Sequence, residues 1–416
     1  MDRQDFPSES SVVVLGGGPA GAAVSALLAA EGHEVLLLER ETFPRFHIGE
    51  SLIPETYWTL KKLGVLDKLE SSRSPVKASV QFISESGKAS KPFYFFERNP
   101  GKRSYTWQVE RSWFDKMLLD NAASKGVDVR MGTVAKEILL EKGKVVGVEA
   151  ATADGSDVAI RSRVLVDATG LNSIVSRKLG LRKKDPRLAK AAVFAHYENG
   201  LRDDGIDEGA TLVIHTPGNR GWFWYIPLSE NRVSVGVVAS PAELFTNGDS
   251  MDAVLEREIR ACPSIAHRLA KARRLLPSKV VTDYTYRATR CAGDGWVLVG
   301  DAYGFIDPIY STGVFLALKS GEMAAETISE SLRRGDCSAE ALGSWGPKLT
   351  GGMDALRKLV YAFYTPGFSF ARFVHEHPQH RDRLTDLLIG DVFKDGVTSI
   401  FDDLREFCDQ PDDSQG

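Results

Sequence analysis

Residues 12–21 read VVVLGGGPAG, and this stretch decides the fold class. Four consecutive apolar residues are typical of a strand that is buried on both faces of a parallel sheet. The glycines that follow break the strand, and the alanine- and leucine-rich segment 22–31 predicts a helix that ends at Gly32. A second apolar run, 35–38, predicts the next strand. The order strand, glycine turn, helix, strand predicts a Rossmann-like α/β unit.

The glycine turn has the spacing of a dinucleotide-binding site. Gly16, Gly18 and Gly21 occupy the three positions of the GxGxxG pattern between a strand and a helix. Backbone N–H groups can approach a pyrophosphate closely at such a turn, and the positive end of the helix favours the phosphate charge. Glu39 ends the second strand, where a carboxylate accepts the ribose hydroxyls. We therefore expect a bound dinucleotide.

Composition excludes several other classes of protein. The chain has 416 residues and a formal net charge of −4, which argues against a general nucleic-acid binder. Its four cysteines form no CxxC motif and no Cys/His cluster, so we expect no disulfide scaffold and no metal site. Residues 1–10 do not resemble a signal peptide, and no stretch approaches the roughly 18 apolar residues that a membrane span needs. We expect a cytoplasmic protein that binds neither membrane nor nucleic acid.

The later segments alternate between the buried-strand pattern and a second sheet. Runs 164–166 and 297–300 predict further buried strands, and 314–333 predicts a long helix. Segment 251–274 predicts a helix broken near Pro263. Four segments predict an antiparallel sheet: 191–196, 210–214, 222–227 and 233–238. The region after 334 is aromatic-rich and predicted to be helical.

Three segments resemble the FAD-dependent aromatic hydroxylases and their relatives. Residues 297–302 end in Gly-Asp-Ala, which contacts the ribityl chain of the flavin in that family, so the resemblance assigns this contact to Asp301. Residues 109–115 (VERSWFD) resemble the second flavin element and imply that Arg111 faces the cofactor. Residues 167–170 (DATG) resemble the third. The resemblance implies FAD rather than NAD.

Residues 221–227 (GWFWYIP) match the WxWxIP motif of the flavin-dependent halogenases. The motif places Trp222 and Trp224 on one face of a strand that ends in Ile226 and Pro227. Such a wall of indoles can separate the flavin from the substrate pocket. The resemblance thus implies that only a small oxidant reaches the substrate.

Lys77 resembles the reactive lysine of the same family. It lies in residues 74–82 (SPVKASVQF), after a halogenase-like stretch, 48–52 (IGESL). An amine buried beside apolar side chains loses proton affinity through desolvation. The spacing to the Gly-Glu-Ser element implies that Lys77 holds hypohalous acid, either as a haloamine or through a hydrogen bond.

Residues 307–314 (DPIYSTGV) precede the predicted long helix and are the candidate halide site. A resting halide is bound by backbone N–H groups and the helix dipole, which Thr312 and Gly313 can supply. Tryptophan halogenases carry a glutamate where this chain has Tyr310. This departure argues against free tryptophan and is similar to the pyrrole and phenol branch of the family.

From Val12 to about Arg405 the chain resembles the flavin-dependent halogenases, including carrier-tethered pyrrole halogenases. The resemblance implies chlorination or bromination of a pyrrole or phenol, free or tethered to a carrier protein. Reduced FAD from a separate flavin reductase, O₂ and chloride or bromide would be needed. The implied cofactor contacts are Gly16, Gly18, Ala20, Gly21, Glu39, Arg40, Ser51, Arg111, Asp301 and Gly313.

Interleaving of the two sheets predicts discontinuous domains. We expect FAD-binding parts at 1–75, 109–185 and 289–333, substrate-domain segments at 76–108 (strands including Lys77) and 186–288 (antiparallel sheet), and a helical C-terminal region at 334–416. The basic segment 268–274, predicted as helix, could dock an acidic carrier or could be a solvated helix face.

Three alternatives remain open at this stage. An aromatic hydroxylase of the same fold would insert oxygen directly, use NADPH by itself and need no halide. A prenyl-chain reductase would have a long apolar tunnel and leave Trp222 and Trp224 without a role. A non-catalytic flavin carrier would leave the Lys77 and Thr312 features without a function.

Overall fold

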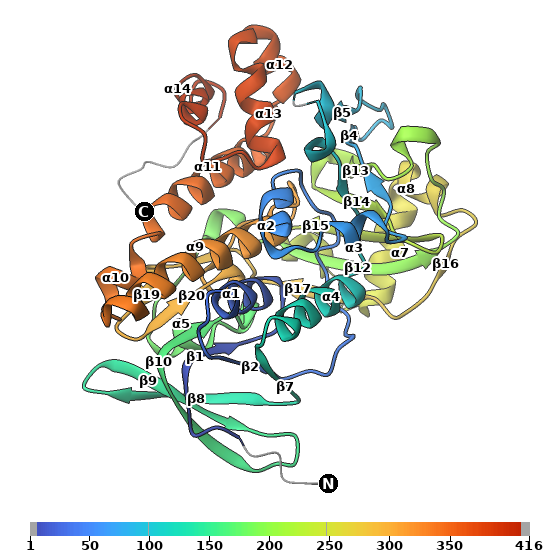
Figure 1. The fold of residues 1–416 in the computed structure, drawn as a ribbon. Coiled ribbons are helices and arrows are strands. Elements are labelled where there is room, and N and C mark those ends of the chain that lie inside the picture. Colours follow the sequence, from blue (N-terminus) through green and yellow to red (C-terminus); the bar gives the residue numbers. More distant parts are fainter. Residues whose placement is uncertain (1–5, 99, 247, 409–416) are drawn as a thin grey trace.

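A sheet built around the glycine turn forms one half of the molecule (Figure 1). The computed structural model describes residues 6–98, 100–246 and 248–408, so residues 1–5 of the N-terminal segment and 409–416 of the C-terminal region lie outside the described residues. The main path of this sheet is β19 (Ala292–Gly293), β20 (Trp296–Leu298), β10 (Asp157–Asp167), β1 (Glu9–Leu15), β2 (Val35–Glu39) and β7 (Asp128–Met131). Strands β20, β10, β1, β2 and β7 are parallel neighbours. The predicted Rossmann-like unit is confirmed.

An antiparallel hairpin extends this sheet, and helices cover it. Strands β8 (Val134–Glu141) and β9 (Lys144–Ala151) pair with each other, and β9 continues onto β10. Figure 1 shows the helices that lie together over one face: α1 (Pro19–Ala30), α4 (Arg111–Ser124) and α9 (Gly313–Arg334). Helix α1 begins three residues before its predicted start because Pro19 suits the first helical turn.

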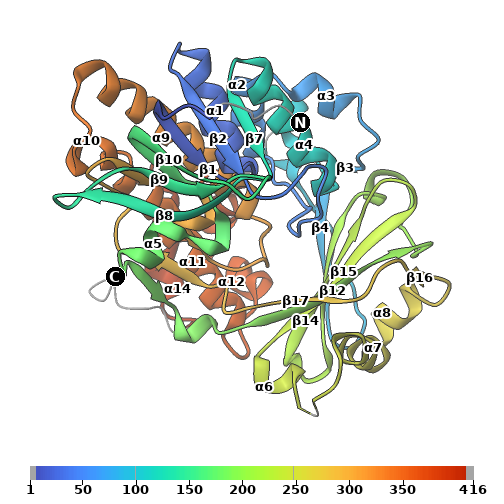
Figure 2. The same cartoon turned by 90° about the horizontal axis from the view of Figure 1, so that it is seen from below.

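The second half contains another sheet, which lies beside the first (Figure 2). Its strands follow the order β16 (Arg273–Arg274), β12 (Ala191–Glu198), β15 (Arg232–Ala239), β14 (Gly221–Pro227), β13 (Thr211–His215), β4 (Ser79–Ile83) and β5 (Phe93–Tyr94), with β17 (Lys279–Thr282) also on β12. The pairing is antiparallel except between β13 and β4, which are parallel. The four segments predicted to form an antiparallel sheet do so. Strand β4 joins them in parallel because it comes from a distant part of the chain, so no hairpin sets its direction.

The two faces of the second sheet belong to different cores. Along β14, Trp222 and Trp224 pack toward the first sheet. Phe223 and Tyr225 pack on the outer face, in the same cluster as residues of α7 (Met251–Ala261) and α8 (Pro263–Arg268). This alternation puts both indoles on one face of the strand, as predicted from the sequence, and in the structure that face packs toward the first sheet.

The predicted helix 251–274 is shorter than expected. It breaks at Pro263 as predicted, but α8 ends at Arg268 and the chain enters strand β16. Arg268 lies 3.0 Å from Asp203, and Arg273 lies 2.6 Å from Glu198. The interpretation of 268–274 as a basic helix face was wrong, because the last part is a strand and acidic partners neutralise its arginines.

Small strand pairs and short helices connect the two halves. Strand β3 (Val76–Lys77) pairs with β6 (Thr106–Trp107). Strands β11 (Arg182–Lys184), β18 (Tyr286–Ala288) and β21 (Gly304–Phe305) form a three-stranded sheet. The short connecting helices are α2 (Thr56–Leu63), α3 (Leu66–Glu70), α5 (Ile174–Lys178) and α6 (Pro241–Leu244).

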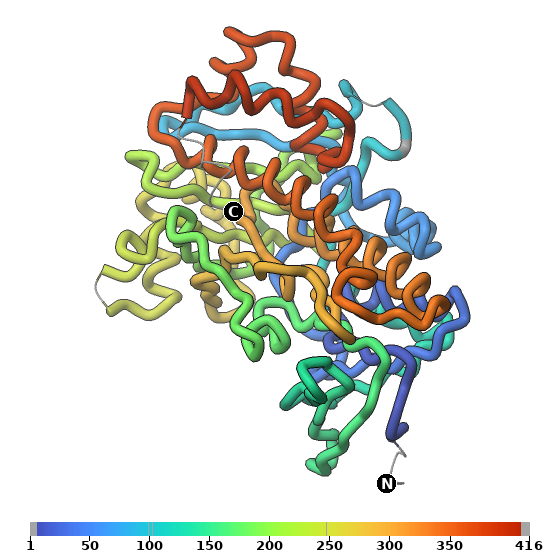
Figure 3. The backbone as a smooth tube through the Cα atoms, turned by 90° about the vertical axis from the view of Figure 1, so that its left-hand side faces the viewer, coloured from blue at the N-terminus to red at the C-terminus, as the bar shows by residue number. Residues whose placement is uncertain are grey.

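The C-terminal region is helical, as predicted. It comprises α10 (Ala339–Gly343), α11 (Gly346–Tyr364), α12 (Phe370–Glu376), α13 (Arg381–Ile389) and α14 (Ile400–Leu404). Figure 3 shows these helices (red) lying across the light-blue segment that carries β4 and β5. Arg98 donates to both carboxylate oxygens of Asp386, at 2.8 and 3.0 Å. The bidentate pair ties α13 to the part of the chain that follows Lys77. The six-segment division into domains stays a prediction.

Two further features of the structure concern membrane-spanning helices and disulfides. Within the described ranges, no helix combines the length and apolar character needed to cross a bilayer. The four cysteines are free and buried.

Candidate active site

The glycine turn leaves room for a ligand at one of its three glycines. A Cβ at Gly21 would overlap the carbonyl oxygen of Gly16, and a Cβ at Gly16 would overlap that of Ala168. At Gly18 the nearest heavy atom to such a Cβ is an Arg45 nitrogen, 3.7 Å away. Gly16 and Gly21 are therefore required by the packing of strand and helix. Gly18 instead keeps the approach to the backbone open, as a pyrophosphate would need.

Glu39 stands at the end of β2 beside this turn. Its Oε2 accepts from Gly17 N at 2.6 Å, and its Oε1 accepts from Glu41 N at 2.8 Å. A carboxylate has about four acceptor positions, so each oxygen keeps one for a further donor. The backbone thus fixes Glu39 in place and leaves it able to accept ribose hydroxyls.

Two arginines share one buried carboxylate at the edge of the same cavity. Arg111 Nε and Nη2 donate to Asp115 at 2.7 and 3.0 Å, and Arg45 Nη1 donates to the same carboxylate at 3.0 Å. Asp115 is fully buried, whereas both arginines line the cavity. Glu41 also pairs with Arg45, at 3.9 Å, so the charges of this cluster are balanced, and its guanidinium groups are the N–H donors that it offers to a phosphate-bearing ligand.

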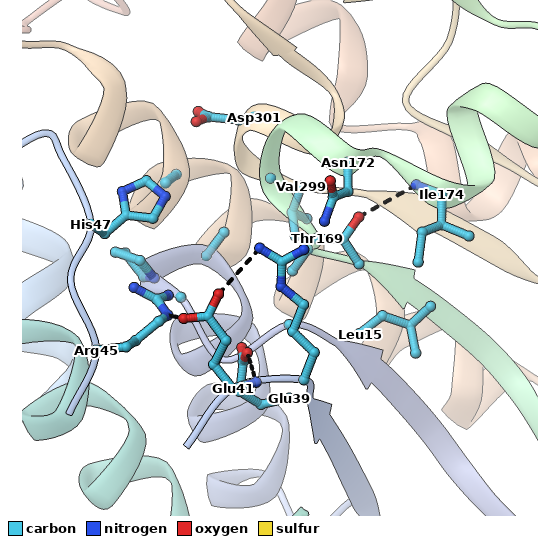
Figure 4. Close-up of a pocket in the computed structure, with 18 of the residues that line it drawn as sticks. Leu15, Glu39, Glu41, Arg45, His47, Thr169, Asn172, Ile174, Val299 and Asp301 are labelled. Carbon is cyan, nitrogen blue, oxygen red and sulfur yellow. Dashed lines mark hydrogen bonds and ion pairs between the residues drawn. The ribbon is translucent and has the colours of Figure 1, made fainter. Parts of the chain in front are cut away.

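The cavity that these residues enclose has a volume of about 240 Å³. Figure 4 shows Glu39, Glu41 and Arg45 near one end and Asp301 apart from them. Burial raises the pKa of Asp301 to about 6, with Arg111 lowering it in part. Ala20, Arg40 and Gly313 also line the cavity. The glycine turn, the Glu39 carboxylate and the Asp301 carboxyl group all line this one cavity. These residues therefore fit the phosphates, the ribose and the flavin end of FAD.

A second cavity, of about 340 Å³, continues from the first. Gly49, Asp301 and Gly313 line both cavities. Trp222 and Trp224 line only the second, with their ring centroids 6.3 Å apart. Ile226 lines it as well, whereas Pro227 ends the strand. The indoles thus form part of the cavity wall on the second sheet, next to the shared boundary.

Lys77 lies behind the wall of the second cavity rather than on it. Its side chain is 1% exposed, and its Nζ donates to Ser51 Oγ at 2.9 Å and to Leu52 O at 3.0 Å. Burial lowers the pKa of Lys77 to about 7. Ser51, which lines the cavity, stands between the amine and the open space. The expected desolvation is present, and a neighbouring hydroxyl separates the amine from the cavity.

The candidate halide loop borders the shared part of the two cavities. Ser311 has a left-handed backbone (φ +56°), Thr312 is buried, and Gly313 begins α9. The first N–H groups of a helix have no carbonyl partner within it. Tyr310 is turned into the core and donates to Leu359 O at 3.0 Å. The loop therefore brings helix N–H groups to the boundary, and position 310 holds a buried tyrosine rather than an acid.

The sequence matches the tryptophan halogenase family over residues 11–100 and 86–367. The chain belongs to this family of flavin-dependent halogenases. It is 32% identical to the 1H-pyrrole-2-carbonyl-[peptidyl-carrier protein] chlorinase of Pseudomonas fluorescens, over 95% of this chain and 92% of the relative. It is 34% identical to the corresponding brominase of Pseudoalteromonas luteoviolacea, over 92% of each.

Solved structures agree with this assignment. The flavin-dependent brominase Bmp2 superposes with a TM-score of 0.86 at 31% identity, covering 96% of this chain and 98% of that one. The myxobacterial chondrochloren halogenase CndH, an FAD-dependent halogenase, gives 0.81 at 32% identity, with 95% and 96% covered. The predicted family, fold class and enzyme type of this halogenase are thus confirmed; the roles of single residues stay predictions.

Sequence reasoning missed several residues of this halogenase. Arg45 lies outside the quoted motifs, and its ion pair with Asp115 joins residues 70 positions apart in the chain. Asp115 ends the 109–115 segment, in which the sequence singled out only Arg111. Asp307 was noticed only as part of the halide loop. It accepts from Tyr364 at 3.1 Å, and Tyr364 in turn accepts from Trp222 Nε1 at 2.9 Å. Burial raises the pKa of Asp307 to about 7. The chain of hydrogen bonds joins α11, the halide loop and the indole wall.

We expect Tyr364→Phe to destabilise the halogenase by about 1–3 kcal/mol, because the change leaves the buried Trp222 N–H without an acceptor and leaves Asp307 with only the bond from the Ile309 backbone N–H. Equilibrium denaturation measures the effect. Tyr57→Phe is the matched control, since the Tyr57 hydroxyl makes no hydrogen bond to another residue of the described ranges. Equal free energies of unfolding for the two variants would show that the Trp222–Tyr364–Asp307 hydrogen bonds do not stabilise the fold by this amount.

Proposed function

We propose that this halogenase chlorinates or brominates an electron-rich pyrrole or phenol, with a pyrrole-2-carbonyl group on a peptidyl carrier protein as the first candidate. The observation that carries the proposal is the buried, weakly basic Lys77 amine, which lies one hydroxyl away from a cavity lined by two indoles. The names of two relatives that match nearly the whole chain support the carrier-bound pyrrole.

FAD, held at the glycine turn and reduced by a separate flavin reductase, supplies the oxidising chemistry that converts halide and O₂ to hypohalous acid. The chain's own groups bind and place the reactants. Amides at Thr312 and Gly313 hold the halide without a full positive charge, so the halide stays free to react. Arg45 and Arg111 hold the phosphates, and Glu39 and Asp301 accept hydroxyl groups.

The second cavity guides the oxidant and excludes the flavin from the substrate. Trp222 and Trp224 line the second cavity and not the first, which supports a role in keeping the flavin ring system on its own side while hypohalous acid passes. Lys77, reached through Ser51, keeps the oxidant at one place. Orientation of the substrate ring against that place then selects the carbon that is halogenated.

The test supplies the enzyme with FAD, a flavin reductase, NADH and chloride or bromide, and analyses the products by mass spectrometry. Substrates are pyrroles and phenols, both free and as carrier-protein thioesters. We expect a halogen to replace a ring hydrogen, with the carrier-bound pyrrole as the best substrate. A hydroxylated product formed without halide would instead identify an aromatic hydroxylase.

We also propose a cytoplasmic setting and the six-segment domain division stated above. Four free, buried cysteines support a reducing compartment. The sharing of strands between sheets supports the division, since β4 pairs with β13 across more than a hundred residues of sequence. Fractionation of cells that express the chain tests the first of these proposals.

A further inference from the structure

Ser51 and Thr211 form a hydroxyl pair between Lys77 and the second cavity. The two oxygens lie 2.9 Å apart, and both residues line the cavity. Ser51 Oγ accepts from the Lys77 amine at 2.9 Å. On the other side, Thr211 Oγ1 accepts from Gln108 Nε2 at 2.8 Å. The pair is thus fixed at both ends by donors that come from behind the cavity wall.

The Ser51–Thr211 pair has one hydroxyl hydrogen that its own hydrogen bonds do not use. Gln108 Nε2 also donates to Gly209 O at 2.9 Å, which sets the orientation of its amide. Each hydroxyl has one hydrogen, and one of the two is used between Ser51 and Thr211. The other has no acceptor within the network. Because both side chains line the cavity, this hydrogen is available to a small polar molecule there.

The Lys77 amine reaches the cavity through this pair. Its Nζ is held by Ser51 and by the Leu52 carbonyl, and the Phe95 ring centroid lies 5.5 Å away. With 1% of Lys77 exposed, a reactant in the cavity meets the hydroxyl of Ser51 before it meets the amine.

We propose that Ser51 is a positioning residue of halogenation, through which the Lys77 ammonium acts on hypohalous acid in the cavity. The inference rests on the proposed function. Ser51 holds the amine, and the Ser51–Thr211 pair donates the remaining hydrogen to the oxygen of the oxidant. No signal in the sequence separates this serine from a simple cofactor contact.

The proton balance of halogen transfer follows from this arrangement. A ring carbon forms its bond to the halogen while the oxygen–halogen bond breaks, and the oxygen takes the bonding pair. Ser51 gives that oxygen a proton and receives one from the Lys77 ammonium, so water leaves and Lys77 becomes neutral. The cationic ring intermediate then loses its ring proton, which returns to Lys77 by way of water. The sum is substrate plus hypohalous acid giving halogenated product plus water.

The test uses the holoenzyme with pyrrole-2-carbonyl carrier protein as substrate and monochlorodimedone as the trap for escaping oxidant. For Ser51→Ala we expect about a 100-fold loss of halogenated product, the size of a lost acid–base contribution. Oxygen consumption stays within about twofold, and trapped oxidant increases. Ser51→Thr restores most of the product because it retains the hydroxyl.

Ser79→Ala is the matched control. Ser79 is also buried and lies on β4, the strand that pairs with the Thr211 strand β13, but its hydroxyl donates to Asp207. The Ser79 variant should leave product formation unchanged. If Ser51→Ala fails to retain FAD, Ser51→Val is compared with Ser51→Thr, which has the same shape, and about a 100-fold loss is expected for the valine variant because it lacks the hydroxyl.

One outcome would overturn the proposal and leave the proposed function standing. In it, the Ser51 variant forms product at the wild-type rate while Lys77→Met is inactive. A wild-type enzyme that halogenates none of the substrates would overturn both.

Discussion

Lys77→Met is expected to retain FAD and to lose halogenation by at least about 100-fold, since it removes the group that holds and protonates the oxidant. Lys77 lines neither cavity, and Ser51, to which its Nζ donates, lines only the second cavity, so the affinity for FAD should change little. Flavin absorbance after gel filtration measures binding, and mass spectrometry measures product.

The same variant should be more stable than the wild type at neutral pH. Burial lowers the pKa of Lys77 to about 7 from an unfolded value near 10.5. Between these values the unfolded chain holds a proton that the folded chain does not, so the free energy of unfolding rises with pH across this window. Below pH 7 the folded wild type carries the full cost of a buried charge, and toward pH 10.5 that cost disappears.

We therefore expect Lys77→Met to raise the free energy of unfolding by about 2 kcal/mol at pH 7 after the two lost hydrogen bonds are subtracted. The gain should shrink toward pH 10. Lys88→Met, at an exposed turn, is the control and should change neither stability nor product. Full halogenation by Lys77→Met would remove this residue from the proposed function, and a gain independent of pH would contradict the buried amine.

Gly21→Ala is expected to abolish FAD binding and to destabilise the fold by about 3 kcal/mol or more, because its Cβ would overlap the Gly16 carbonyl at the closest approach of β1 and α1. Backbone cannot move aside as a flexible side chain can. Calorimetric unfolding and flavin titration measure the two effects.

Gly18→Ala separates ligand binding from folding. Its Cβ meets only an Arg45 nitrogen at 3.7 Å, and the Gly18 backbone (φ −69°) suits any residue. The chain should thus fold normally without FAD, within about 0.5 kcal/mol, yet bind FAD at least about 10-fold more weakly. Gly351→Ala, on an exposed helical position with open space, should stabilise slightly. Equal FAD affinity of Gly18→Ala and wild type would place the pyrophosphate elsewhere.

Local patterns account for what could be predicted about the fold. The buried run before Gly16, the break at Pro263 and the alternation along β14 all reflect interactions between near neighbours in the chain. The helix predicted to reach residue 274 failed because the end of that segment pairs with β12 as a strand, and charge alone does not reveal such a partner. The parallel pairing of β4 with β13 was missed for the same reason.

By itself, the sequence determined the glycine turn and the placement of both indoles on one strand face, and it singled out Lys77 as a candidate, since short motifs record constraints of backbone geometry and chemistry. Only the tertiary structure decided that Lys77 stands behind Ser51, that Thr211 completes the pair, and that Tyr364 fixes Trp222. Ser51 and Thr211 are 160 positions apart, and their contact depends on how two sheets pack. Side-chain neighbours across such distances are set by the burial of whole surfaces, which no local spacing of residues encodes.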